Sequence, residues 1–460
     1  MKLETVTRRR PRIFHGWWIV LAAALINVYG AGVWFYGFPI FYKALLDEFG
    51  WSAAAGAAII SLSRLEGGIE APVIGWLVDR FGPRRLAFVG AVITGLGFMV
   101  MSRVASFNVG PIHVNAFVAF ALLYAGWMSI GYNTGFGHAT AAAVNAWFIK
   151  KRARAFAIFS LGSGGSGLIV FLLGWLVDQY GWRGAAFWAG VGVFVIVIPL
   201  TLLLRHKPEQ YGLLPDGEDP RCENSASSDG ERDDGLAMPL RTSEAMGAHP
   251  PSTAKGQRPE YDFTVKESIL TFAFWMLVLG SAARSITMTS VVVHEVVYLT
   301  DVRNIPLIQA SAALGAMVTV SLVGRLGLGW LGDYVDKRYL LIATYLFQAL
   351  GIYILSGVTT MSQVWLFVVV YGIAYGGAIP LYLAIVGEYF GRQYYATIRG
   401  FMQLFLVPAA VLGPVYAGWV YDTTKSYQMA FTSFIVVLVV GTVFVFLARR
   451  PPLPQRSPES

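Results

Sequence analysis

Long apolar stretches alternate with short polar connections along most of this chain. A helix needs about 20 apolar residues to cross roughly 30 Å of hydrocarbon, and twelve stretches reach that length. We therefore expect twelve transmembrane helices, six on each side of a polar central segment. The expected spans are residues 17–42, 53–78, 86–102, 114–143, 155–177, 184–204, 268–299, 306–331, 339–358, 364–387, 400–421 and 429–447.

The polar central segment, residues 206–262, is rich in Ser, Pro, Gly and charge. Such a composition cannot bury a core, so we expect a mostly disordered linker. The chain then divides into an N-terminal segment (1–16), a first six-helix half (17–205), the linker (206–262), a second six-helix half (263–448) and a tail (449–460).

Composition supports a membrane protein, because 56% of the 460 residues are hydrophobic and only 13% are charged, against roughly 25% charged in a typical soluble domain. The single cysteine, Cys222, excludes an intrachain disulfide and a multi-cysteine metal site. The sequence contains no phosphate-binding loop, no nucleophile–base pair and no metal-ligand pattern. We therefore expect no enzyme activity, no cofactor and no bound metal.

The net charge of +8 could indicate nucleic-acid binding, but the positions of the basic residues favour another reading. With the N-terminus inside the cell, most of the 35 Lys and Arg residues fall in cytoplasmic segments, as the positive-inside rule requires. The charge is then a topology signal that places both termini in the cytoplasm, and we expect no nucleic-acid partner. The basic residues outside are Lys43, Arg103, Arg183, Arg303 and Lys425.

One short pattern, Gly-Trp-x-x-Asp, occurs four times, each time at the end of an apolar run. It reads GWLVD at 75–79 and 174–178, GWLGD at 329–333 and GWVYD at 418–422. The first and third copies end helices in the cytoplasm, and the second and fourth end helices outside. This arrangement predicts inverted repeats within each half, although the second and fourth copies also fit a simple helix-end signature without function. A second similarity relates the halves. The stretches WFIKKRARAFAIF from Trp147 and YFGRQYYATIRGF from Tyr389 each precede the later copy of the pattern in their half.

The first copy continues as GWLVDRFGPRR and the third as GWLGDYVDKR. These stretches resemble the signature of the major facilitator superfamily. HGWWIV, EFGWS, YGWRGAAFW, KPEQYGLLPDG and GRLGLGWLGD further resemble its bacterial monocarboxylate-transporter-like branch, near the oxalate/formate antiporters. The resemblance implies an all-α major facilitator fold, the bacterial cytoplasmic (inner) membrane, a monomer, and a latch that closes the cytoplasmic side. The gating residues it implies are Gly75, Asp79, Arg80, Arg84, Gly329, Asp333 and Arg338.

Inserting a charged side chain into the membrane within a helix costs about 2.5–3.5 kcal/mol or more. Each such residue is therefore a candidate for a functional role. The resemblance implies that Arg325, in the eighth helix, binds the substrate carboxylate. Arg284 and Arg64 are further candidates, because a guanidinium forks two donors onto a carboxylate. The alternative is internal pairing that only locks helices together. Asn133, Tyr371 and Tyr375 could line the cavity, although aromatic stripes also pack cores.

Four groups could carry a proton. Glu66 and Glu70 are four residues apart and share a helix face, where two like-charged carboxylates favour binding one proton. Glu295 and His138 are the other candidates. Hydrogen bonding to neighbouring helices is the alternative for each of them.

The reading that combines these features is a proton-coupled symporter of a small organic anion, working by alternating access within the lipid bilayer. Oxalate transport in the resembled relatives uses a second cation in the eleventh helix, and this chain has no Lys or Arg there between residues 401 and 420. The resemblance therefore favours a monocarboxylate over a dianion. The alternative is an organic-anion exchanger without proton coupling. A transporter-like nutrient sensor is a more distant alternative.

Overall fold

The computed structural model describes residues 14–51, 53–109, 112–217 and 261–453. Ten segments in this part of the chain are long and apolar enough to span a membrane. One of them, Arg152–Leu203, holds two helical rods, because Gly181 leaves the helical conformation with φ 67° and ψ 170°. A further rod, the 29-residue α3, carries Arg64, Glu66 and Glu70. The expected twelve-helix architecture is therefore confirmed.

The first half contains six rods, several of them broken by π-helical turns. The first is α1, η1 and α2, the fourth runs from α5 to α7, and α8 to α10 form the fifth and sixth. Their bounds are α1 His15–Ala31, η1 Gly32–Tyr36, α2 Phe38–Phe49, α3 Ala53–Phe81, α4 Pro83–Met101, α5 Ala116–Ala121, η2 Leu122–Met128, α6 Ser129–Tyr132, η3 Asn133–His138, α7 Ala139–Trp147, α8 Arg152–Gly164, α9 Gly167–Gly192, η4 Val193–Val197 and α10 Ile198–Leu203.

The second half begins with a short helix, α12, and then has six long rods with fewer interruptions. Their bounds are α12 Val265–Leu270, α13 Phe272–Val297, η7 Tyr298–Val302, α14 Leu307–Leu331, α15 Lys337–Ser356, α16 Met361–Phe390, α17 Tyr395–Thr424 and α18 Gln428–Leu447.

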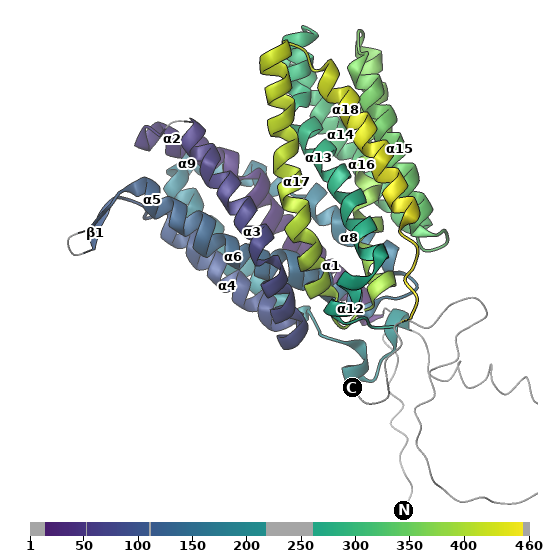
Figure 1. Cartoon of the computed structure of the whole chain (residues 1–460). Coiled ribbons are helices and arrows are strands. Elements are labelled where there is room, and N and C mark those ends of the chain that lie inside the picture. Colours follow the sequence, from purple (N-terminus) through teal and green to yellow (C-terminus); the bar gives the residue numbers. More distant parts are fainter. Residues whose placement is uncertain (1–13, 52, 110–111, 218–260, 454–460) are drawn as a thin grey trace, which may run out of the picture.

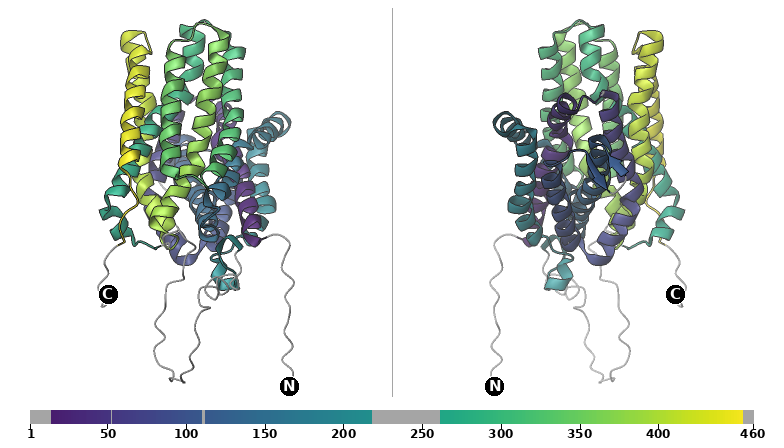
Figure 2. Two further views of the ribbon diagram at one scale, coloured as in Figure 1. Left: turned by 90° about the vertical axis from the view of Figure 1, so that its right-hand side faces the viewer. Right: turned by 90° about the vertical axis from the view of Figure 1, so that its left-hand side faces the viewer.

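The two halves meet at one end of the molecule and diverge toward the other (Figure 1). We call the end that carries the loops at 148–151 and 390–394 the linker side, and the opposite end, which carries the hairpin described below, the far side. Figure 1 shows α3 and α17 converging toward the linker side, and the views in Figure 2 show the helices of both halves running roughly along one common axis. On the far side, the helices of one half are therefore separated from the helices of the other half.

Small residues hold the helices of each half together, as expected where the lipid removes the hydrophobic driving force. In the first half, Gly90 on α4 lies against the backbone of Gly131 and Gly135. In the second half, Gly324 on α14 lies against the carbonyl of Ile373, and Gly376 on α16 lies against the carbonyl of Ser321. Side chains at these positions would force the backbones apart.

Two connections carry structure of their own. An antiparallel hairpin between α4 and α5 pairs β1 (Phe107–Val109) with β2 (Ile112–Val114). Residues 206–217, which we assigned to the linker, contain the 3₁₀ turns η5 (Pro208–Tyr211) and η6 (Pro215–Gly217). Linker residues 218–260, including Cys222, lie outside the described residues.

The close backbone contact of α14 with α16 gives a prediction about stability. Gly324→Ala places a Cβ on the Ile373 carbonyl, and we expect it to destabilise the protein by about 1–3 kcal/mol, as overpacked cores do. Gly327→Ala on the same helix is the matched control, since no described atom lies within 4 Å of its Cβ position. Thermal unfolding in detergent should show a lower midpoint for the first variant and an unchanged or higher one for the second. Equal midpoints would contradict the packing.

Candidate functional site

Asp79, near the end of α3, caps the first turn of α17 in the other half. Its carboxylate accepts hydrogen bonds from the backbone amides of Ala396 (3.2 Å) and Thr397 (2.7 Å) and from the Thr397 hydroxyl (2.6 Å). The start of α17 has no side-chain cap of its own. An aspartate from the opposite half therefore satisfies amides that a helix start leaves unpaired and faces the positive end of the helix dipole.

Asp333, just after α14, does the same for α8. It accepts hydrogen bonds from the amides of Ala153 (3.1 Å) and Arg154 (3.3 Å), and its other oxygen lies 3.0 Å from Arg154 Nε. The start of α8 also lacks a side-chain cap. We call these two contacts between the halves, α3 with α17 and α14 with α8, the seams. The glycine of each motif packs at the seam of its own aspartate: Gly75 lies against the Ala396 backbone and Gly329 against Ala157.

Burial disfavours the charged form of the Asp333 carboxyl at the contact between α14 and α8. Burial raises the pKa of the Asp333 carboxyl, and the opposing hydrogen bonds and the Arg154 charge offset only part of that rise. Pairing therefore does not fully compensate for the loss of hydration.

The basic residues predicted for the gate lie elsewhere. Arg80 stacks over Trp76, with its guanidinium 5.1 Å from the ring centre, and Arg84 is exposed. Arg338 donates a hydrogen bond to the Tyr339 hydroxyl (3.1 Å). The structure thus brings Gly75, Asp79, Gly329 and Asp333 to the seams but not these three arginines.

The residues that do meet the aspartates were missed by the sequence analysis. They are Ala153 and Arg154 at the start of α8, and Ala396 and Thr397 at the start of α17. A signal for them existed, because both pairs lie inside the two related stretches that begin at Trp147 and Tyr389. Any residue type can supply a backbone amide, so the similarity of the two stretches did not predict that these amides bind the aspartates.

Arg325 is buried in the seam between α14 and α8, with 2% of its surface exposed. Its Nη1 donates hydrogen bonds to the Ser160 carbonyl and to the Ser163 hydroxyl (2.6 Å). The Ser163 hydroxyl in turn donates to the Ser160 carbonyl (2.9 Å), which orients its lone pairs toward the arginine. The equivalent position on α3 is Ala71, which packs against Gly400, so seam packing does not itself require a cation.

Arg284 lies on α13, facing α16, and is partly buried. Its Nη2 donates to the Tyr375 carbonyl (2.9 Å), and its guanidinium lies 5.9 Å from the Tyr375 ring centre. Among the described residues no carboxylate forms an ion pair with it, and its buried Nε has no hydrogen-bond partner. The Tyr371 hydroxyl beside it is also buried without a partner there. Arg284 therefore keeps donors available for an anion.

The two glutamates of α3 form one cluster with Asn133. The Asn133 amide donates to Glu70 (2.5 Å), and the Glu66 and Glu70 side chains interact electrostatically with each other. Two like-charged carboxyl groups this close favour the binding of one proton. Asn133 is thus held by Glu70, and Gly67 leaves it the space to approach α3.

The remaining predicted residues lie apart from this cluster. Arg64 is exposed and interacts electrostatically with Tyr124. Glu295 has 1% of its surface exposed, and neither carboxyl oxygen has a hydrogen-bond partner within the described chain. His138 is buried close to the positive charge of Arg399. The structure does not bring Glu295 or His138 together with Glu66 and Glu70.

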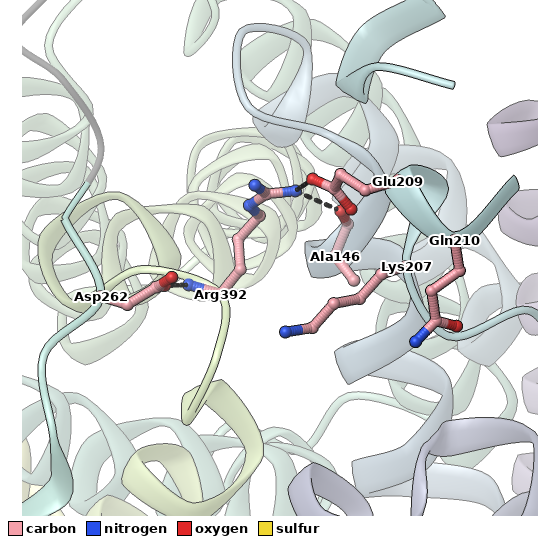
Figure 3. Close-up of a pocket in the computed structure, with 6 residues that line it drawn as sticks. All are labelled: Ala146, Lys207, Glu209, Gln210, Asp262 and Arg392. Carbon is pink, nitrogen blue, oxygen red and sulfur yellow. Dashed lines mark hydrogen bonds and ion pairs between the residues drawn. The ribbon is translucent and has the colours of Figure 1, made fainter. Parts of the chain in front are cut away.

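A cavity of about 280 Å³, lined mostly by charged residues, lies on the linker side (Figure 3). Arg392 from the second half crosses it and bonds to Glu209 (2.8 Å) and to the Ala146 carbonyl (3.0 Å). Asp262, at the end of the linker, accepts hydrogen bonds from the amides of Arg392 (2.5 Å) and Gln393 (2.9 Å). The ends of the linker thus belong to the closed linker side.

At the other end of the linker, Asp216 holds the loop that precedes α8. Its carboxylate accepts hydrogen bonds from the amides of Ile149 (2.9 Å), Lys150 (2.8 Å) and Lys151 (3.0 Å). Across the described residues, no group of three or more His, Cys, Asp or Glu side chains is placed to hold a metal ion.

Comparison with known proteins gives the family. The profile of the Major Facilitator Superfamily matches residues 20–409 and 270–460. YcxA, an uncharacterised MFS-type transporter of Bacillus subtilis, is 23% identical over 446 residues, which cover 94% of this chain and 93% of that protein. Monocarboxylate transporter 14 of Mus musculus is 23% identical over 497 residues, covering 97% of this chain and 93% of that protein.

Solved structures agree on the fold. The MFS proton:xylose symporter XylE matches with a TM-score of 0.68 at 11% identity, covering 94% of this chain and 95% of that one. Because the family profile matches most of the sequence, the chain belongs to the Major Facilitator Superfamily and is a membrane transporter, not an enzyme.

Proposed function

We propose that this transporter carries a small monocarboxylate together with a proton by alternating access. The observation that carries the proposal is Arg284, a cation within the membrane with no carboxylate partner among the described residues and with a buried Nε that lacks an acceptor. A substrate carboxylate would supply the missing charge and acceptors in a bidentate pair. The name of the mouse relative, a monocarboxylate transporter, supports this substrate class.

In this proposal the linker side is cytoplasmic, because the basic residues gather there, and the membrane is the bacterial inner membrane. Both termini are then cytoplasmic and the working unit is a monomer. The closed seams at Asp79 and Asp333 make this the outward-facing state. The far side, where the halves diverge, is the side from which the anion enters.

The proposed cycle starts with the anion at Arg284, where the Tyr371 hydroxyl and Tyr375 add contacts. The proton is held between Glu66 and Glu70, with Asn133 holding Glu70 in place. The anion and the proton together carry no net charge, which lowers the cost of closing the far side. Rocking of the halves then separates α14 from α8 and releases Arg325 from Ser160 and Ser163, so that Arg325 becomes available to the carboxylate.

Arg64, Glu295 and His138 have supporting places in this proposal. Arg64 is exposed on α3 and attracts the incoming anion. Glu295, buried without a hydrogen-bond partner within the described chain, is a second proton site near the far side. His138 is the weakest proton candidate, because the nearby Arg399 charge disfavours a second positive charge.

Exchange of anions without a proton is the alternative function. The same Arg284 favours it, since an empty site would leave a cation uncompensated while the halves rock. An exchanger therefore returns only with an anion bound. The two functions differ in whether a pH gradient alone drives accumulation.

Transport should depend on Arg284. In proteoliposomes with an inward proton gradient, we expect accumulation of labelled lactate or pyruvate, and we expect Arg284→Gln to weaken apparent affinity about 10–100-fold, since hydrogen bonds to a charged group contribute about 1.5–3 kcal/mol. Lys266→Gln, which removes an exposed cation, is the control and should leave uptake unchanged. Uptake that ignores the gradient but needs an anion inside would favour exchange.

The glutamate pair should carry the proton. Glu70→Gln keeps a hydrogen-bonding partner for Asn133 but cannot hold a titratable proton, so gradient-driven accumulation should fall to near the level of empty liposomes. Anion-for-anion exchange by the same variant should persist, because that mode needs no proton. Accumulation at the wild-type level would exclude Glu70 as the coupling group.

The linker-side seam should respond to Asp79→Asn. Loss of the charge weakens the interaction with the start of α17 by about 1 kcal/mol, and we expect about a fivefold rise in molecules open on the linker side. Spin labels at Lys151→Cys and Tyr334→Cys, in a Cys222→Ser background, would report the distance between α8 and α14 there. Asp301→Asn, an exposed far-side change, is the control. No change in the distance distribution for Asp79→Asn would remove its role as a latch.

A further inference from the structure

Two of the four Gly-Trp-x-x-Asp copies take no part in the seams described above. Asp178 on α9 and Asp422 on α17 are both exposed, and both stand on the far side. Gly174, which begins the second copy, has no described atom within 4 Å of its Cβ position. These copies have the same sequence pattern as the two that hold the linker side, yet they have no partner of that kind in this state.

The same two helix pairs connect all four copies. The rod of α8 and α9 runs antiparallel to α14, and α3 runs antiparallel to α17. On the linker side, Asp333 at the end of α14 caps the start of α8, and Asp79 near the end of α3 caps the start of α17. At the far ends of these pairs the roles are reversed, since α9 ends its first rod beside Asp178 and α17 ends beside Asp422.

The register of the first pair can be followed along its contacts. Asp333 faces Ala153, Gly329 faces Ala157, and Leu322 faces Gly164. The facing residues thus keep pace in this antiparallel pair: moving toward the N-terminus of α14 by a given number of residues corresponds to moving toward the C-terminus of the α8–α9 rod by the same number. Continued past the point where the helices diverge, the same register places Gly174 opposite Ala312 and Asp178 opposite Ile308, in the first turn of α14.

The second pair gives the same result independently. Asp79 faces Ala396, and Gly68 faces Val407. The contacts of Gly75 with Ala396 and of Gly400 with Ala71 are offset from this register by one helical turn. Continued along α17, these contacts place Asp422 within one turn of Ala53, the first residue of α3. Both unused aspartates therefore fall at the start of the helix that faces them.

The start of α14 resembles the two helix starts that are already capped from the other half. Its N-cap position is Pro306, which makes no side-chain capping hydrogen bond, and the starts of α8 and α17 likewise have no side-chain cap of their own. The face of α9 that continues from Gly164 carries Leu168 and Phe171, each 79% exposed in this state. Contact with α14 would cover both side chains.

We infer that Asp178 and Asp422 close the far side in the inward-facing state. Asp178 caps the first turn of α14 and Asp422 caps the first turn of α3, as Asp333 and Asp79 cap α8 and α17 in the present state. The four copies thus form two alternating latches, one on each side of the membrane. This inference rests on the proposed alternating access, but it does not depend on which substrate is carried.

Disulfide cross-linking tests the register directly. In a Cys222→Ser background, the pair Gly174→Cys and Ala312→Cys should cross-link on mild oxidation, because a disulfide needs Cα atoms about 4.4–6.8 Å apart. The pair Gly174→Cys and Ala316→Cys, one helical turn out of register, should not. Asp79→Asn should raise the yield of the first cross-link by opening the linker side. Absence of the in-register cross-link in that background, or equal yields from both pairs, would overturn the inference.

The sign of the charge variants separates the inference from a structural role. Asp178→Asn and Asp422→Asn should each shift the population about fivefold toward the outward-facing state, opposite in sign to Asp79→Asn. Spin labels at Lys151→Cys and Tyr334→Cys report that shift without any substrate. A helix-end signature without function predicts no shift, and that result would overturn the latch. If neither lactate nor pyruvate is transported, the proposed substrate is wrong. The opposite population shifts and the cross-link are still expected in that case.

Discussion

A charged side chain inside a bilayer needs a compensating partner there. The contacts of the charged side chains where the two halves face each other follow from this requirement. Arg325 is bonded across the seam to a carbonyl and a hydroxyl on α8. Glu66 and Glu70 lie close together on α3, where two like charges favour the binding of one proton. Arg284 is satisfied only in part, by one carbonyl and an aromatic ring. In the proposed function, a substrate anion completes the compensation of Arg284.

A second constraint acts at the ends of the helices. Helix starts leave amides without partners, and α8 and α17 have no caps of their own. Aspartates from the opposite half supply the acceptors, so each of these contacts joins two halves that move apart in the proposed cycle. Burial opposes the charged form of Asp333 even with Arg154 beside it. The two contacts join the halves on the linker side, and in the proposed cycle they open.

The sequence was informative where the physics is local. Hydropathy located the helices, because the bilayer demands long apolar stretches, and the four repeated motifs indicated inverted repeats before any contact was known. Gly75, Asp79, Gly329 and Asp333 lie where the two halves meet, and their gating role stays a prediction. The partners of these residues were not found, because amides at Ala396 and Thr397 have no signature in the sequence.

Long-range pairing was equally hidden in the sequence. Nothing there tells that Asn133 bonds to Glu70, that Ser160 and Ser163 hold Arg325, or that Arg392 crosses to Glu209. The basic residues Arg80, Arg84 and Arg338 follow the aspartates in sequence but point away from them, since aromatic side chains nearby offer Arg80 and Arg338 other contacts. Helical spacing fixes a face, whereas the partner depends on which helix packs against that face.

The most direct test of the account is the number of protons taken up when an anion binds. Isothermal titration of the purified protein with lactate, repeated near pH 7 in buffers of different ionisation enthalpy, separates the heat of proton uptake from the heat of binding. The account predicts about one proton bound per lactate in the wild type and almost none in Glu70→Gln. Lactate binding without proton uptake in the wild type would contradict the coupling of anion and proton at this site.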